Sequence, residues 1–127
     1  MSAAELIEAL GNAAADDAGL MMEAWEHLCR NSADFRRYAC TSVDDYGLTV
    51  TGQFCRFVDV RAFESAALLM VPNGCGWRIW APAADSLQPH RATIWAARGQ
   101  PMFSPFDVDA ATPAHAICIA ALKARRA

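Results

Sequence analysis

The chain has 127 residues and a net charge of −3, and 54% of its residues are hydrophobic, although 27 residues are alanine. This length fits a single domain over residues 1–127 and suffices for a hydrophobic core without disulfides or a structural metal. The composition disfavours two classes of protein, because no apolar run approaches the length of a membrane-spanning helix and the chain lacks the clustered Lys and Arg of duplex DNA binders.

An N-terminal helical segment is expected over residues 1–30. Ser2 and Glu5 match a capping box, in which both side chains satisfy exposed amides of the first helical turn, so a helix begins directly after Ser2. Gly11–Asn12 ends it. Residues 13–30 predict a second helix, since their apolar side chains recur at spacings of three and four. These side chains belong to Met21 or Met22, Trp25, Leu28 and Cys29.

The next stretch, from Asn31 to Gly47, is mixed and polar, and we expect no regular element there before a turn at Asp44–Gly47. Leu48–Thr51 alternates apolar and polar residues, and Phe54–Val58 has the composition of a strand. We therefore expect one or two strands here, with Gly52 as a hairpin tip or a bulge.

A compact helix is expected over Phe63–Val71, which is rich in alanine and leucine. Pro72 ends it, because proline cannot continue a helix. Trp77–Trp80 predicts a short strand and His90–Ala96 its return strand, joined by a loop over residues 81–89.

A third strand is expected over Met102–Val108. Pro105 interrupts it, which favours a sheet edge where a missing amide hydrogen is tolerated. Strands and one short helix thus occupy residues 43–108. A C-terminal helix follows over residues 112–125, because Thr112–Pro113 supplies an N-cap and then a proline at the first helical position. Its apolar stripe consists of Ala114, Ile117, Cys118, Ala121 and Leu122.

Strand alternation indicates how the sheet is covered. Trp77 and Ile79 point to one face, whereas Arg78 and Trp80 point to the other, so both faces carry large apolar groups. A sheet with one solvated face shows a cleaner division. We therefore expect helices on both sides of the sheet, or a helix on one side and a binding surface on the other. The expected fold class is α+β, a single-domain helix–sheet–helix (α/β/α) sandwich with a small, mainly antiparallel sheet.

Two segments of the second half carry a resemblance to a known family. Ala66–Pro72 leads to Gly76–Trp80, and Ala110–Ala124 contains Thr-Pro followed by Ala-Ile-Cys and Ala-Ala-Leu. This combination resembles the phage ABA sandwich domain of small phage and prophage proteins. The chain departs from that family at Glu64–Ser65, where the family has Leu-Asp, and by inserting Asn73–Cys75. Over about residues 60–124, the resemblance implies a helix–sheet–helix sandwich and a phage or prophage origin, with no established catalytic residues.

One face of the expected sheet combines tryptophan with arginine. Two indoles beside two guanidiniums can stack on a base and bind a phosphate, so this face is the candidate ligand or partner site. In the alternative interpretation, a helix covers the tryptophans and the arginines extend to its rim. The candidate residues are Arg78, Trp80, Arg91, Thr93 and Trp95.

No catalytic residue, metal ligand or cofactor is predicted. The five cysteines are scattered and form no zinc motif, and we expect most of them to be small buried hydrophobic residues. Cys75 lies in a glycine-flanked turn, but the three histidines occur in unrelated contexts and supply no evident base. Asp44–Asp45 and the pair Asp107 and Asp109 are interpreted as solvated turn acids.

These observations favour a non-enzymatic phage or prophage accessory protein that acts by binding, most plausibly by inhibiting a host defence component. The alternative is sequestration of a small nucleotide-like ligand. A small enzyme that uses Cys75 or a carboxylate pair is a third hypothesis. We expect a host protein or a nucleotide-like ligand as the partner, a homo-oligomer, no membrane or duplex DNA contact, and a location in the cytoplasm of the bacterial host cell.

Overall fold

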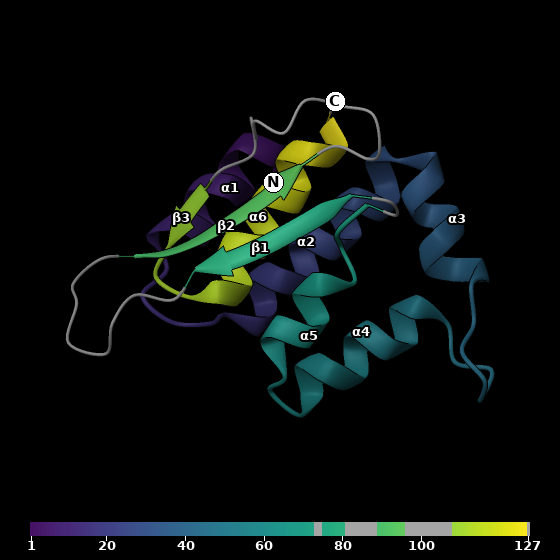
Figure 1. The fold of residues 1–127 in the computed structure, drawn as a ribbon. Helices are drawn as coiled ribbons and strands as arrows, with labels where there is room; N and C mark the ends of the chain where they lie inside the picture. Colours follow the sequence, from purple (N-terminus) through teal and green to yellow (C-terminus); the bar gives the residue numbers. More distant parts are fainter. Residues whose placement is uncertain (73–74, 81–88, 96–107, 127) are drawn as a thin grey trace.

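The computed structural model describes residues 1–72, 75–80, 89–95 and 108–126 (Figure 1). In these ranges the chain forms helices and one three-stranded sheet, and none of the described helices has both the length and the apolar character that a transmembrane segment requires. The elements are α1 (Ala3–Asn12), α2 (Ala18–Asn31), α3 (Ala33–Thr41), α4 (Val50–Asp59), α5 (Phe63–Leu68), β1 (Gly76–Trp80), β2 (His90–Trp95), β3 (Val108–Ala110) and α6 (Pro113–Arg126).

The sheet forms an outer layer of the described fold. Its strand order is β1-β2-β3 with both pairs antiparallel, so β1 and β3 are its edges. α6 packs along one face, α1 lies beside it against β3, and α2 and α5 contact α6 further from the sheet (Figure 1). The α+β class and the small antiparallel sheet are confirmed. The described helices lie on one side of the sheet, however, rather than flanking both faces as in the expected helix–sheet–helix order.

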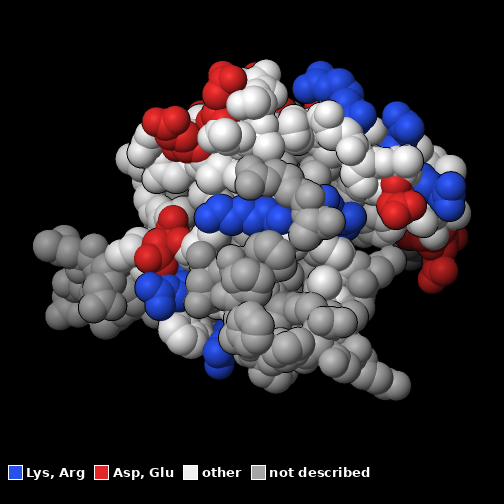
Figure 2. Space-filling view, turned by 90° about the horizontal axis from the view of Figure 1, so that it is seen from above, with Lys and Arg blue, Asp and Glu red and all other residues white. Residues whose placement is uncertain are grey.

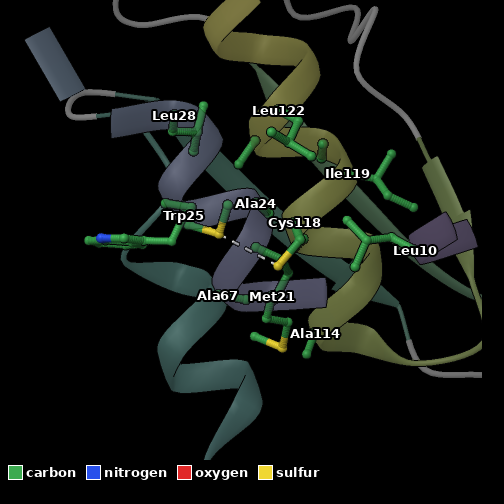
Figure 3. Close-up of a cluster of buried hydrophobic side chains, with 14 of the residues drawn as sticks. Leu10, Met21, Ala24, Trp25, Leu28, Ala67, Ala114, Cys118, Ile119 and Leu122 are labelled. Atoms are coloured by element: carbon green, nitrogen blue, oxygen red, sulfur yellow. Dashed lines mark hydrogen bonds between the residues drawn. The ribbon is translucent and has the colours of Figure 1, made fainter. Parts of the chain in front are cut away.

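The central element of the packing is α6. Every residue from Ala114 to Leu122 is buried, because the helix contacts all three strands on one side and α1, α2 and α5 on the others. The sequence predicted a narrower apolar stripe. A helix enclosed on all sides needs small side chains for close approach, and the alanines of α6 meet that need. Figure 3 shows side chains from α1, α2 and α5, including Leu10, Met21 and Ala67, converging on Cys118 and its neighbours.

A second packing centre surrounds Trp25 on α2. Its ring stacks on Phe54 of α4, with centroids 4.3 Å apart, and meets the edge of Phe35 of α3 at 4.8 Å. The indole Nε1 donates a hydrogen bond of 3.1 Å to Thr51 Oγ1. Aromatic pairs in these geometries contribute beyond their buried area, so this cluster joins α2, α3 and α4.

The strands predicted over Leu48–Thr51 and Phe54–Val58 are wrong, because Val50–Asp59 forms α4. Before this helix, Thr49 makes an isolated antiparallel bridge with Val43. Thr49 caps the helix by accepting a 3.1 Å hydrogen bond from the Gly52 amide. Gly52 therefore lies in a helical turn rather than at a hairpin tip or bulge. Val50 and Phe54 are buried at the i, i+4 spacing of a helix. The β-favouring side chain of Phe54 gains more from packing on Trp25 than from a strand, since strand propensity depends on context.

The polar stretch after Asn31 contains a helix that the sequence analysis missed. α3 begins at a Ser32 cap, whose hydroxyl accepts from the Phe35 amide, and it buries Phe35 and Ala39 on one face. Two buried residues are too short an apolar pattern to predict a helix from the sequence. The turn expected at Asp44–Gly47 is confirmed: the Asp44 carboxylate accepts two backbone amides, and Gly47 has a positive φ of 80°.

Most of the other predicted elements are confirmed. The α1 helix begins after the Ser2 cap, as expected, and α2 begins at Ala18 rather than near residue 13 because the Asp17 side chain caps it. α5 ends before Pro72, and α6 begins at Pro113. The strands β1 and β2 occur as predicted. β3 covers the end of the third expected strand and lies at an edge. The expected segments over residues 81–88, 96 and 102–107 lie outside the described residues.

The position of α6 generates a stability prediction. Ile117→Ala removes a fully enclosed side chain and should lower the free energy of unfolding by about 2–5 kcal/mol, because the rigid surroundings leave a cavity. Lys123→Ala on the same helix, where the side chain is only half-buried, should change it by less than about 0.5 kcal/mol. Urea unfolding measures both variants. Equal effects of the two substitutions would contradict the central role of α6.

Candidate functional site

The sheet register brings four of the five predicted site residues together. Arg78 is opposite Thr93 across the β1–β2 pair, and Trp80 is opposite Arg91. Cross-strand partners share a face, so these four side chains lie on the face opposite to α6. The fifth residue, Trp95, pairs with Gly76 at the end of β2, but its side chain lies outside the described part of the structure.

The centre of this face is the Trp80 ring. The guanidinium carbon of Arg78 lies 4.7 Å from the ring centroid, and that of Arg91 lies 5.9 Å from it. Both distances place a cation within reach of the electron-rich face of an indole. Trp80 nevertheless remains 47% exposed. Among the described residues, no helix therefore covers Trp80, in contrast to the alternative interpretation.

Arg91 also joins the cluster to β3. Its Nε and one terminal nitrogen donate to the two Asp109 carboxylate oxygens at 2.8 and 3.3 Å, across the β2–β3 pair. The hydrogen bond from Arg91 lowers the pKa of Asp109 below its ordinary value. The sequence analysis took Asp109 for a solvated turn acid. This is wrong, because the residue lies in a strand, and the pairing depends on a register that the sequence does not reveal.

The members of this surface differ in what they can offer a ligand. Thr93 is only 9% exposed and therefore presents little surface, whereas Arg78 and Arg91 are exposed. In the described structure, Arg78 contacts only the Trp80 ring and makes no ion pair, so its N–H groups remain available to a carboxylate or phosphate. We refer to Arg78, Trp80, Arg91 and Asp109 as the Arg–Trp face.

The charged groups of the surface are mixed in sign. Acidic and basic side chains alternate among the described residues on the view from above (Figure 2). The Arg–Trp face follows the same pattern, because the carboxylate of Asp109 balances one of its two guanidiniums. The Arg–Trp face can therefore bind a partner through stacking on Trp80 and through one cation, Arg78, rather than through a strongly positive potential.

The thiols show no catalytic arrangement. All five cysteines are free, and only Cys118 is buried. Burial raises the pKa of the Cys118 thiol to about 12, and the Asp16 carboxylate acts in the same direction. Cys118 instead donates to the Met70 sulfur at 3.5 Å (Figure 3). Cys75 is half-buried, and no hydrogen bond joins it to a described histidine or carboxylate. The expectation that most cysteines are buried is thus wrong.

Two of the histidines have structural positions. His115 is fully buried, and its Nε2 accepts a 3.0 Å hydrogen bond from the Asp17 amide, which joins α6 to the start of α2. His27 contacts the Asn31 side chain at 3.3 Å. Within the described ranges, no three His, Cys, Asp or Glu side chains gather as metal ligands do.

A cleft of about 200 Å³ near the end of α6 was not anticipated from the sequence. Arg125 lies beside it and donates from Nε to the Met70 carbonyl at 2.7 Å. The same guanidinium lies 4.4 Å from the Phe35 ring centroid, and burial lowers its pKa. Arg125 therefore holds the end of α6 against α3 and the end of α5. The sequence indicated only a favourable charge near a helix C-terminus. The cleft is lined by His27, Leu28, Asn31, Ser32, Leu122 and Arg125.

Comparisons with known proteins do not assign the chain to a family. No protein-family model matches the chain, and neither do any curated proteins or solved structures. The resemblance to the phage ABA sandwich domain stays a prediction.

The Arg91–Asp109 pair predicts a pH-dependent stability. A carboxyl whose folded pKa is lowered stabilises the fold above its ordinary pKa of about 4, and this contribution is lost as the pH falls through the folded value. Asp109→Asn should cost about 0.2–1 kcal/mol at pH 7, since both partners are exposed, and less at pH 2. Unfolding curves at both pH values, with the exposed turn variant Asp45→Asn as control, measure the difference. If Asp109→Asn lowered the free energy of unfolding equally at both pH values, the stabilising role of the Arg91–Asp109 pair would be contradicted.

Burial also predicts the order of thiol reactivity. In the native protein, a thiol-specific reagent such as Ellman's should label the exposed Cys40 first, and Cys40→Ser should remove this fast phase. Cys118 should react only after unfolding, because it is enclosed and its thiolate form is disfavoured. Mass spectrometry of labelled peptides assigns each phase. Rapid native labelling of Cys118 would contradict the packing of α6.

Proposed function

We propose that this chain is a non-enzymatic binding protein that uses the Arg–Trp face to hold a partner protein. The supporting observation is Trp80, which is half exposed while two guanidiniums lie over its ring. Tryptophan and arginine are the residues most enriched at the energetic centres of protein interfaces. The cation–π contacts also restrict their side chains before binding, which reduces the entropy lost on association.

The geometry favours a protein partner over a small ligand. Small-molecule sites bury most of the ligand in a concave pocket, whereas Trp80 and Arg78 stand on the exposed side of a sheet. Arg91 already forms an ion pair with Asp109, and it would have to break this pair in order to bind a phosphate instead. A rim carboxylate on a partner protein can instead pair with Arg78 without disturbing that ion pair.

The biological setting of the proposal rests on the sequence resemblance. Small phage and prophage proteins that lack catalytic residues can act by occupying a surface of a host protein, and we propose that the partner is a host component, most plausibly of a defence system. A small single domain with a preformed aromatic face suits this role.

Substitution of Trp80 tests the proposed surface. Affinity capture from a bacterial host lysate should recover one stoichiometric partner with the natural chain, and Trp80→Ala should weaken the purified complex about thirty-fold or more, as for interface hot spots. Tyr46→Ala is the matched control, because Tyr46 is 94% exposed in a distant turn. Circular dichroism establishes that both variants fold. No stoichiometric partner, or equal affinity of the two variants, would contradict the proposal.

A nucleotide-like ligand is the second candidate, favoured by the stacked Arg78 and Trp80 side chains. Tryptophan fluorescence during titration with a panel of nucleotides distinguishes the two. We expect no change in fluorescence, because Arg91 is already paired with Asp109. A saturable change at micromolar concentrations that Trp80→Ala removes would replace the partner protein with the small ligand.

A further inference from the structure

The cleft near the end of α6 is lined by a cation that has no carboxylate partner. Arg125 is half-buried there, its Nε donates to the Met70 carbonyl, and its guanidinium lies over the Phe35 ring. Burial lowers the pKa of Arg125, and the groups that act in the opposite direction are Tyr38 and Cys75 rather than an acid. Within the described ranges Arg125 forms no ion pair. A guanidinium removed from water normally pairs with an anion, so the terminal nitrogens of Arg125 can receive one.

The ring of His27 is a second donor in the cleft. Asn31 Nδ2 donates to the His27 carbonyl at 2.8 Å, which identifies this atom as the amide nitrogen, and it lies 3.3 Å from His27 Nδ1. Because an amide nitrogen can only donate, Nδ1 is the acceptor, and the proton of the neutral imidazole is on Nε2. No described residue accepts from Nε2, so this N–H is left for a ligand.

The hydroxyl of Ser32 is a third donor. Its oxygen accepts the Phe35 amide at 3.1 Å as the N-cap of α3, and its proton is left to bind another acceptor. The backbone acceptors beside the cleft are already used, because the Leu28 carbonyl accepts from the Ser32 amide and the Ser32 carbonyl from the Arg36 amide. The groups that remain for a ligand are therefore mainly donors.

We infer that this cleft binds a phosphate group. Its guanidinium, imidazole and hydroxyl donors come from α6, from α2 and from the junction of α2 with α3, and the oxygens of a tetrahedral oxyanion can accept from several directions. The cleft has a volume of about 200 Å³, below the roughly 300–1,000 Å³ of sites for drug-sized ligands, so the ligand is small.

The apolar part of the cleft supports binding of a charged group. Leu28 and Leu122 line the cleft and are buried, and they lie at the same end of α2 and α6 (Figure 3). Apolar surroundings lower the local dielectric constant, which strengthens hydrogen bonds between the donors and an anion. The cleft thus combines a half-buried cation with an apolar wall.

Nuclear magnetic resonance measures binding at Arg125 directly. Inorganic phosphate, titrated at constant pH and ionic strength, should shift the Arg125 Nε–H signal saturably. The dissociation constant should lie in the millimolar range, because hydrogen bonds at a partly exposed site compete with water. Acetate should bind more weakly, since a carboxylate has fewer acceptor oxygens. A natural chain without a saturable shift, or one that binds acetate as tightly as phosphate, overturns the proposal.

Ser32→Asp tests the site while keeping the packing of Arg125. The aspartate can still cap α3 by accepting the Phe35 amide, but it places a negative charge in the cleft. Phosphate binding should weaken about tenfold or more, since like charges at close range repel. Ser2→Asp makes the same change at the N-cap of α1, outside the cleft lining, and should alter the affinity by less than about twofold because salt screens exposed charges. A folded Ser32→Asp variant with unchanged affinity overturns the proposal.

Two further titrations locate the site and its ligand. O-phosphoserine separates the two sources of a phosphate group: tighter binding than inorganic phosphate supports a phosphorylated ligand, and equal or weaker binding supports the free ion. Trp80→Ala should bind phosphate as the natural chain does, because Trp80 is on the sheet face away from α6. Loss of phosphate binding in this variant would overturn the assignment to the cleft. The result is therefore independent of whether the Arg–Trp face binds a host protein.

Discussion

The enclosure of α6 is the constraint on which the rest of the fold depends. From Ala114 to Leu122 the helix has buried residues on every side, with the sheet on one side and other helices around it. This is possible because most of these side chains are small, so neighbouring backbones approach closely without leaving voids. Two polar side chains of the helix make contacts inside the fold: His115 Nε2 accepts a hydrogen bond from the Asp17 amide, and the Cys118 thiol donates to the Met70 sulfur, whereas His115 Nδ1 is buried without a hydrogen-bond partner in the described structure. Large substitutions anywhere on this helix must displace an entire layer.

The position of α6 also explains why the candidate surface lies away from the described helices. The helices gather around α6 and therefore lie on one side of the sheet, which leaves the opposite face to residues with both apolar and charged parts. Two guanidiniums lie over the Trp80 ring, which stays half exposed, and the Arg91–Asp109 pair holds one of those guanidiniums in place. The face is thus ordered by contacts within the chain before any partner arrives. The same strand alternation that creates this face places Trp77 on the opposite one, toward α6.

Local signals were sufficient where the physical cause is itself local. The capping box at Ser2, the N-cap at Thr112 and the Asp44 turn all depend on side chains hydrogen bonding to amides within a few residues, and all three occur. The alternation in β1 and β2 correctly assigned their faces. The errors arose where distant residues decide the outcome. Phe54 has a strand-like neighbourhood, yet its packing on Trp25 makes the segment helical, and the short helix α3 exists because Phe35 meets the same tryptophan.

The sequence by itself determined the helix caps, the turn, the two main strands and which residues of those strands share a face, because each follows from backbone geometry over a few residues. Only the tertiary structure decided that α4 is a helix, that Asp109 joins the Arg–Trp face, and that Thr93 is buried while Trp80 is exposed. These outcomes depend on strand register and on which layers meet. Both are set by the burial of apolar surface between segments far apart in the chain, a free energy to which no local window of residues is sensitive.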